Sequence, residues 1–140
     1  MPRNVVVDAG PLVALLIGGD ARHHWTREQF VRMRPPLMTC EPVLGEAAFI
    51  VERMGGDASA VAALVEKGVL RIAISVQEHA AQLRALMQRY RDLPMSLADA
   101  CLVRLVEIVD DPVLMTFDSD FGVYRRHRRL AIPLLAPEDA

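Results

Sequence analysis

The hydrophobic positions of this chain alternate between short continuous runs and longer stretches with helical spacing. Short apolar runs bounded by turn residues are typical of buried strands. Five such runs lie at 4–7, 37–39, 71–74, 113–115 and 131–134. Because helical patterns separate them, we predict an α/β fold with three layers, in which a central, mostly parallel sheet of four to five strands is flanked by helices.

Capping and helix-breaking residues set the boundaries of the predicted helices. Pro11 suits the first turn of a helix that Gly18-Gly19 ends, and Pro42 begins a long helix that Gly55-Gly56 ends. Ser75 and Glu78 have the spacing of a capping box. On this basis the helices cover about 11–17, 20–32, 42–54, 57–67, 75–91 and 96–109, with a short helix or turn from residue 119.

Acidic residues follow the predicted strands at the edge where α/β proteins build their sites. Asp8 follows the first strand, and Asp118 follows the fourth. The helix that carries Glu46 starts just after the second strand, at the same edge. Asp8 has an alternative role as the cap of the next helix, and Asp118 and Asp120 have an alternative role in a polar turn. Thr116 can orient a carboxylate or a water by hydrogen bonding.

Two further carboxylates interrupt apolar helical patterns. Glu46 shares a helical face with Val43, Ala47 and Ile50. The alternative is a glutamate at the edge of that face with its carboxylate in water. Asp99 stands three residues after Ser96, so it has an alternative role in a capping box, which is compatible with a second role for its other oxygen.

Together these acids indicate a metal site. Few lysines or arginines lie near them in the sequence, and burying an unpaired carboxylate costs several kcal/mol. A divalent cation is the simplest way to keep Asp8, Glu46, Asp99 and Asp118 ionised together. Such a cluster favours metal-dependent phosphodiester chemistry.

Composition and charge narrow the picture further. The 140 residues fit one domain, 1–140, and the net charge is only −2. Hydrophobic residues make up 52% of the chain, which indicates either a rich core or a surface covered by a partner. The apolar runs are too short to cross a membrane, and the N-terminus lacks the layout of a signal peptide, so we expect a cytoplasmic protein with Cys40 and Cys101 reduced.

The basic residues are almost all arginines, and four of them are grouped near the last acidic cluster. These are Arg125, Arg126, Arg128 and Arg129. Arginine suits phosphate because its planar fork donates two hydrogen bonds at once, so we expect this group to bind the phosphates of a substrate. The alternative is a solvated turn before the last strand.

The acidic motifs together resemble the PIN-domain ribonucleases, and most of all the VapC-like toxins of toxin–antitoxin modules. The resemblance runs from about residue 4 to 134 and rests on Asp8-Ala9-Gly10-Pro11-Leu12, Glu46, Ser96-Leu97-Ala98-Asp99-Ala100 and Thr116-Phe117-Asp118-Ser119-Asp120-Phe121. Gly10 departs from the family, where many members carry a hydroxyl residue. The segment 20–24 also resembles the family, without any chemistry assigned to it.

The resemblance implies an endoribonuclease that uses Mg²⁺ or Mn²⁺. It implies that Asp8, Glu46, Asp99 and Asp118 form the acidic quartet, with Asp120 as an auxiliary ligand and Thr116 as the hydroxyl of the last motif. It also implies a small antitoxin partner and a homodimer.

Other classes of protein are less compatible with the sequence. A catalytically silent PIN-like interaction protein would use the apolar helices as an interface, but all four acids are present. A haloacid-dehalogenase-like phosphatase needs an Asp at position 10, which is glycine, and a receiver domain needs a lysine after a late strand, whereas the lone lysine is Lys67. The four histidines show no acid–base pair for a metal-independent ribonuclease.

Overall fold

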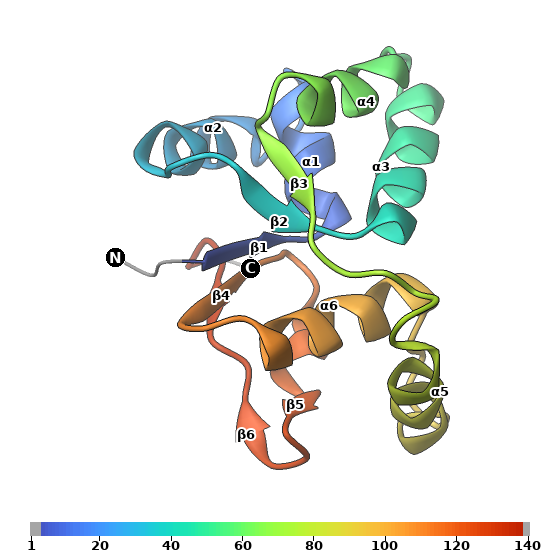
Figure 1. Ribbon diagram of the computed structural model, residues 1–140. Helices are drawn as coiled ribbons and strands as arrows, with labels where there is room; N and C mark the ends of the chain where they lie inside the picture. The colour runs from blue at the N-terminus through green and yellow to red at the C-terminus, as the bar shows by residue number, and fades with distance from the viewer. Residues whose placement is uncertain (1–3, 139–140) are drawn as a thin grey trace.

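A five-stranded parallel sheet forms the centre of the molecule (Figure 1). The computed structural model describes residues 4–138. The strand order is β3-β2-β1-β4-β7, and every pairing is parallel. The strands are β1 (Asn4–Val7), β2 (Leu37–Thr39), β3 (Leu70–Ile72), β4 (Pro112–Met115) and β7 (Leu134–Leu135). The predicted fold class is confirmed.

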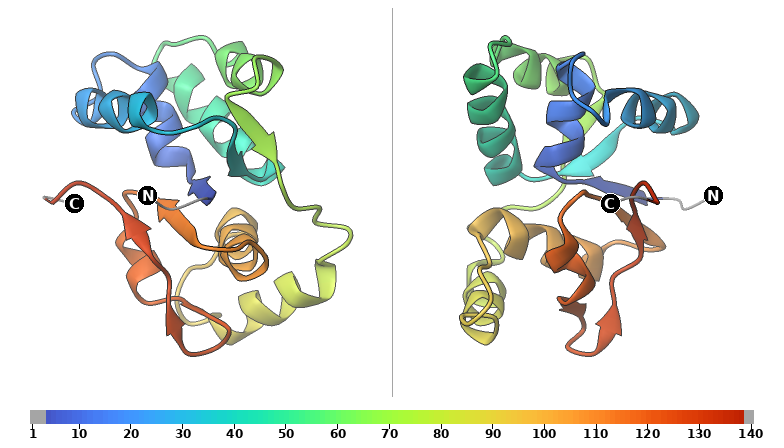
Figure 2. Two further views of the ribbon diagram at one scale, coloured as in Figure 1. Left: turned by 60° about the vertical axis from the view of Figure 1, so that its left-hand side comes forward. Right: turned by 180° about the vertical axis from the view of Figure 1, so that it is seen from behind.

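Helices cover both faces of this sheet, as Figures 1 and 2 show. One face carries α1 (Ala9–Leu16), α2 (His23–Arg32), α3 (Glu41–Arg53) and α4 (Ser59–Glu66). The other face carries α5 (Ala80–Arg89) and α6 (Leu97–Ile108). A 3-10 helix, η1 (Ser119–Gly122), follows β4. Burial on both faces explains why the strands are continuous apolar runs rather than alternating ones.

The central strands hold the acidic segments in register. Val5 pairs with Val113 and Val7 pairs with Met115. The next residues in this register are Asp8 and Thr116, and the Asp8 N–H donates to the carbonyl of Met115 over 3.0 Å. The two loops that leave the centre of the sheet therefore start side by side.

The predicted fifth strand, 131–134, is wrong in its extent. Leu130–Ala131 (β6) pairs antiparallel with Arg125–Arg126 (β5) in a separate hairpin, and Leu134–Leu135 joins the main sheet beside β4. Pro133 lies between the two pieces and has no N–H to continue a ladder, although its carbonyl accepts from the Leu114 N–H. The apolar run 130–135 therefore contributes one strand to the hairpin and another to the central sheet.

Boundaries of other elements also differ from the sequence-based prediction, among them those of α1, α2, α4 and β4 by one to three residues. β3 begins at Leu70 and ends at Ile72, two residues before the predicted end. The Ser75 hydroxyl accepts from the Glu78 N–H over 3.3 Å, but regular helix begins only at Ala80. A local capping contact there forms a turn rather than the first turn of α5.

Within residues 4–138, no helix is long and apolar enough to cross a membrane. Cys40 and Cys101 are both buried and free.

Candidate functional site

Asp8 lies at the centre of the acidic edge of the sheet and is almost completely buried, with 7% of its surface exposed. It caps α1, because its Oδ1 accepts from the Ala9 N–H over 2.7 Å. Its Oδ2 accepts from the Thr116 hydroxyl over 2.7 Å. The capping alternative is therefore correct for one oxygen, and the other oxygen binds the last acidic motif.

Thr116 connects the first and last acidic segments. Its hydroxyl donates to Asp8 and accepts from the Asp118 N–H over 3.0 Å. Asp118 Oδ1 in turn accepts from the Asp120 N–H over 2.9 Å and so begins η1. This leaves Asp118 Oδ2 for another partner. The polar-turn alternative and a site role for Asp118 are thus compatible.

Asp99 is held by a complete capping box at the start of α6. The Ser96 hydroxyl accepts from the Asp99 N–H over 3.0 Å, and Asp99 Oδ2 accepts from the Ser96 N–H over 3.1 Å. The capping box fixes the carboxylate and leaves Oδ1 for another partner.

Glu46 lies at the border of the apolar face of α3. The buried face of this helix consists of Val43, Ala47 and Val51, whereas Glu46 is exposed. The expectation that Glu46 stands within the apolar face is therefore wrong, because the face runs along i, i+4 and i+8. Within the described residues the Glu46 carboxylate accepts no hydrogen bond, so Glu46 is less constrained than Asp8, Asp99 and Asp118, whose carboxylates do.

A pocket of about 610 Å³ joins these acids. It is lined by Glu46, Pro94, Met95, Ser96, Asp99, Asp118 and Asp120. Asp8 is buried beside this lining and interacts electrostatically with Asp99 and Asp118. The structure thus brings all five predicted acids to one place, from four segments of the chain.

The electrostatics of the cluster are those of acids without compensating cations. Burial raises the pKa of Asp8, and repulsion by Asp99 and Asp118 adds to it, against the lowering effect of its two hydrogen bonds. Partial desolvation and then Asp8, Asp99 and Asp118 raise the pKa of Glu46. Burial also raises the pKa of Asp99, with Asp118 and Asp120 contributing. In every case the repulsion comes from another carboxylate.

The donor set fits a hard divalent cation. Within residues 4–138 no group of three or more acidic, histidine or cysteine side chains is arranged as a ready-made metal site. Mg²⁺ keeps several waters and binds through one or two carboxylates plus substrate phosphate, so a wide pocket suits it. Free oxygens on Asp99, Asp118 and Glu46 and the mutual repulsion of the acids agree with this choice of ion.

None of the four arginines near residue 127 lines the pocket that holds the acids. The His127 N–H donates to Glu107 over 2.7 Å, two turns along α6 from Asp99, which corresponds to about 12 Å of helix. Both views in Figure 2 place the β5–β6 hairpin well below the start of α6. Arg125 uses its guanidinium on the carbonyls of residues 122–124. Arg128 and Arg129 are exposed, and Arg126 is half-buried.

Tyr124 is a supporting residue that the sequence patterns did not identify. Its ring is fully buried against Phe121 and Tyr90. Its hydroxyl donates to the Pro94 carbonyl over 2.7 Å, and its N–H donates to the Asp120 carbonyl over 3.1 Å. It therefore connects the loop before Asp99 with the turn that holds Asp118. A tyrosine shortly after the last acidic motif, in a chain with few aromatics, was the one signal that could have found it.

Tyr124→Phe removes this connection and keeps the ring. The Pro94 carbonyl loses this hydrogen bond, so we expect a loss of about 0.5–1.5 kcal/mol in the free energy of unfolding. Because both sides of the pocket shift, the Mn²⁺ concentration for half-maximal thermal stabilisation should rise several-fold. Thermal unfolding with and without Mn²⁺ measures both. Tyr90→Phe, which loses the hydrogen bond from the Arg125 N–H instead, is the matched control. An unchanged Mn²⁺ requirement in Tyr124→Phe would contradict this role.

Comparison with known proteins agrees with this arrangement. A model of the PIN domain family matches residues 5–126. The chain matches no curated protein sequence. Among solved structures, Mycobacterium tuberculosis VapC20, described as a sarcin-ricin loop cleaving toxin, is 26% identical. The match covers 86% of this chain and 94% of that one, with a TM-score of 0.77.

Proposed function

Because the chain belongs to the PIN domain family, we propose that it is a metal-dependent endoribonuclease and the toxin of a toxin–antitoxin module. The observation that carries the proposal is the convergence of Asp8, Glu46, Asp99 and Asp118 at one pocket. The similarity to a VapC toxin that cleaves RNA supports the substrate class. We further propose a single domain over 1–140 and a cytoplasmic location.

In the proposed mechanism, some of the acids hold a cation and another accepts a proton. Asp8, Asp99 and Asp118 would hold Mg²⁺ or Mn²⁺, with Asp120 as an auxiliary group. A divalent ion there supplies Lewis-acid stabilisation of the phosphate and lowers the pKa of an attacking water. The Glu46 carboxylate has no hydrogen-bond partner among the described residues and has a raised pKa, which suits a general base. It takes the proton of the water that attacks phosphorus, and the bond from phosphorus to the 3′ oxygen breaks.

Mn²⁺ or Mg²⁺ is expected to raise the melting temperature of the protein. The ion binds the native acidic cluster and relieves the repulsion that raises the pKa values of Asp8 and Asp99. At one hundred times the dissociation constant the gain is about 2.7 kcal/mol. Differential scanning fluorimetry over a millimolar titration measures the shift, with K⁺ at equal ionic strength as the control. A concentration of about 10 mM should exceed the dissociation constant of such a site. The absence of any shift in melting temperature at that concentration would count against the cluster as a metal site.

The ends of the RNA fragments test the proposed reaction. Hydrolysis by an activated water leaves a 5′-phosphate and a 3′-hydroxyl, whereas attack by the RNA 2′-hydroxyl leaves a cyclic phosphate. Total cellular RNA cut in Mn²⁺ should therefore yield fragments that RNA ligase joins directly to an adapter at their 3′ ends. Fragments that require removal of a 3′-phosphate first would exclude the mechanism.

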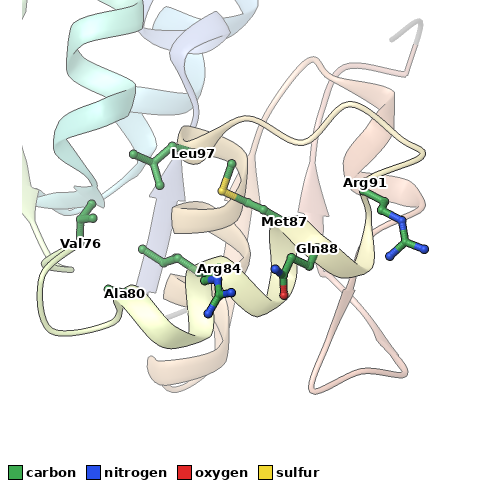
Figure 3. Close-up of a pocket in the computed structure, with 8 residues that line it drawn as sticks. Val76, Ala80, Arg84, Met87, Gln88, Arg91 and Leu97 are labelled. Carbon is green, nitrogen blue, oxygen red and sulfur yellow. The ribbon is translucent and has the colours of Figure 1, made fainter.

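The proposed partners are an antitoxin that covers the acidic pocket and a second copy of the chain. For the homodimer we assign the apolar groove between α5 and the start of α6, shown in Figure 3. It has a volume of about 420 Å³ and is lined by Val76, Ala80, Leu83, Arg84, Met87, Gln88, Arg91 and Leu97. Val76 and Leu97 both line this groove and are exposed, and an exposed apolar groove is typical of a surface that a partner covers. Light scattering of Met87→Glu against wild type measures the mass, and an unchanged dimer would exclude this face.

A catalytically silent PIN-like interaction protein is the alternative function. Metal-induced stabilisation without any RNA cleavage would favour it.

A further inference from the structure

Arg22 is a cation that the structure holds against the acidic loop through the ring of Phe117. The raised pKa values of Asp8, Glu46 and Asp99 come mainly from burial and from neighbouring carboxylates. An RNA strand that enters this pocket therefore meets negative charge, and its phosphates need a cation close by. The carbon at the centre of the Arg22 guanidinium lies 4.9 Å from the ring centroid of Phe117, the residue between Thr116 and Asp118.

The Phe117 ring forms a fixed platform for this guanidinium. Trp25 packs on it edge-to-face, with ring centroids 5.8 Å apart and an interplanar angle of 62°. On the other side, Gly10 leaves room for the ring, because a Cβ at position 10 would come within 3.0 Å of Phe117 Cδ2. The glycine that departs from the family pattern thus allows the ring to lie against the start of α1.

The backbone around Arg22 is also held in place. The Arg22 N–H donates to Asp20 Oδ1 over 2.8 Å. The ring of the next residue, His23, hydrogen-bonds through Nδ1 to the Ala14 carbonyl of α1 over 2.7 Å. These contacts attach the start of α2 to α1, and the two helices lie side by side in Figure 1. These contacts therefore fix the backbone at Arg22 relative to α1.

The donors of Arg22 are not used by the rest of the described chain. No carboxylate between residues 4 and 138 forms an ion pair with it, and its Nε is buried without a hydrogen-bond partner. By contrast, Arg104 binds His79 and Glu107, and Arg125 binds backbone carbonyls. A guanidinium stacked on an aromatic ring with free N–H groups suits bidentate binding of a phosphate.

We infer that Arg22, supported by Phe117, binds an RNA phosphate adjacent to the one that is cleaved. The inference rests on the proposed ribonuclease function and names the residue that recognises the substrate backbone. A phosphate contact gives affinity without reading the base sequence, so Arg22 acts on substrate binding and not on the choice of cleavage site.

The test compares Arg22→Gln with Arg27→Gln, an exposed arginine in the adjoining helix α2. We expect Arg22→Gln to raise KM roughly tenfold with kcat changed less than threefold, and Arg27→Gln to match wild type. The slope of log affinity against log salt should become shallower by about one in Arg22→Gln. Phe117→Leu keeps the arginine but removes the platform, and its KM should lie between those of wild type and Arg22→Gln. Melting temperatures of all variants show that the fold is intact.

Three outcomes would overturn the inference. Equal KM and salt slope for Arg22→Gln and Arg27→Gln, in a protein that cleaves RNA, would remove Arg22 from the substrate path and leave the proposed function standing. A change confined to affinity for a protein partner, with KM for RNA unchanged, would assign Arg22 to that partner. Wild-type protein that neither binds nor cleaves RNA would overturn the proposed function and this inference together.

Discussion

Asp8→Asn is expected to make the metal-free protein more stable and to abolish RNA cleavage. Asparagine can still cap α1 through its oxygen, and its amide can donate to the Thr116 hydroxyl, so the local fold is retained. What disappears is a buried charge that Asp99 and Asp118 repel. We expect a rise of roughly 2–5 °C in the metal-free melting temperature, because about 1 kcal/mol shifts a domain of this size by a few degrees.

The direction of the Asp8 pKa shift determines how the stability gain of Asp8→Asn depends on pH. The pKa of Asp8 is raised in the folded protein above the ordinary 3.8, so the native state binds the proton more tightly than the unfolded chain. In wild type, the stabilisation that comes from protonated Asp8 is fully present below the pKa of Asp8 in the unfolded chain. It is lost as the pH rises through the raised pKa of Asp8 in the folded protein. The advantage of Asp8→Asn over wild type should therefore be large at neutral pH and vanish near pH 3.8.

Thermal melts in EDTA measure the change in metal-free stability. They should cover about pH 4 to 8, the range over which a raised carboxyl pKa changes stability. RNA cleavage in Mn²⁺ measures the loss of activity. Asp57→Asn is the control, since Asp57 is a fully exposed carboxylate whose pKa is lowered by hydrogen bonds from Ser59. It should leave cleavage unchanged and show no gain in stability at neutral pH. A destabilised Asp8→Asn at neutral pH without metal would contradict the prediction, because it would mean that the folded protein already compensates the Asp8 charge.

Thr116→Val is expected to reduce cleavage by about 10–100-fold, as loss of the partners of metal-binding carboxylates commonly does. The side chain is almost fully buried, with 2% of its surface exposed, and valine has nearly the same shape. The substitution leaves Asp8 Oδ2 without its 2.7 Å donor and the Asp118 N–H without its acceptor. Unsatisfied buried groups of this kind cost about 1–3 kcal/mol in the free energy of unfolding.

Thr116→Ser separates the hydroxyl from the methyl group. Serine keeps both hydrogen bonds, so its activity should lie within a few-fold of wild type, at a modest cost in packing. Cleavage rates and chemical denaturation of the two variants provide the comparison. If Thr116→Val and Thr116→Ser were equally active, the hydroxyl would have no part in orienting the acids.

The sequence predicts the sheet well where burial and turn residues agree. The runs 4–7 and 37–39 are strands with the same bounds as predicted, because both are central and covered on both faces. The prediction fails at 131–134, where the partner of each residue depends on distant parts of the chain. Apolar character cannot show that Leu130–Ala131 returns along β5 while Leu134–Leu135 follows β4.

The acids could be predicted because strand ends meet at one edge of a parallel sheet. Their supporting contacts could not be predicted, since Thr116 with Asp8 and Tyr124 with Pro94 join residues that are far apart in the chain. The arginines near residue 127 show that closeness in the sequence does not imply closeness in the fold. They follow Asp118 closely in sequence, yet β5 leads the chain along α6 away from its start. Arg22, distant from Phe117 in the sequence, lies against it instead.

Cleavage of total cellular RNA by wild type and Asp99→Asn, each in Mn²⁺ with and without EDTA, tests the central claim most directly. Asparagine can accept the Ser96 N–H and so retain the capping box at the start of α6. We predict discrete fragments from wild type in Mn²⁺, none in EDTA, and at least a thousandfold less cleavage by Asp99→Asn, whose metal-free melting temperature should not fall below that of wild type because the lost charge is one that Asp118 and Asp120 repel. Equal cleavage by the two proteins, or cleavage that persists in EDTA, would contradict an RNA-cleaving site built from these carboxylates and a metal ion.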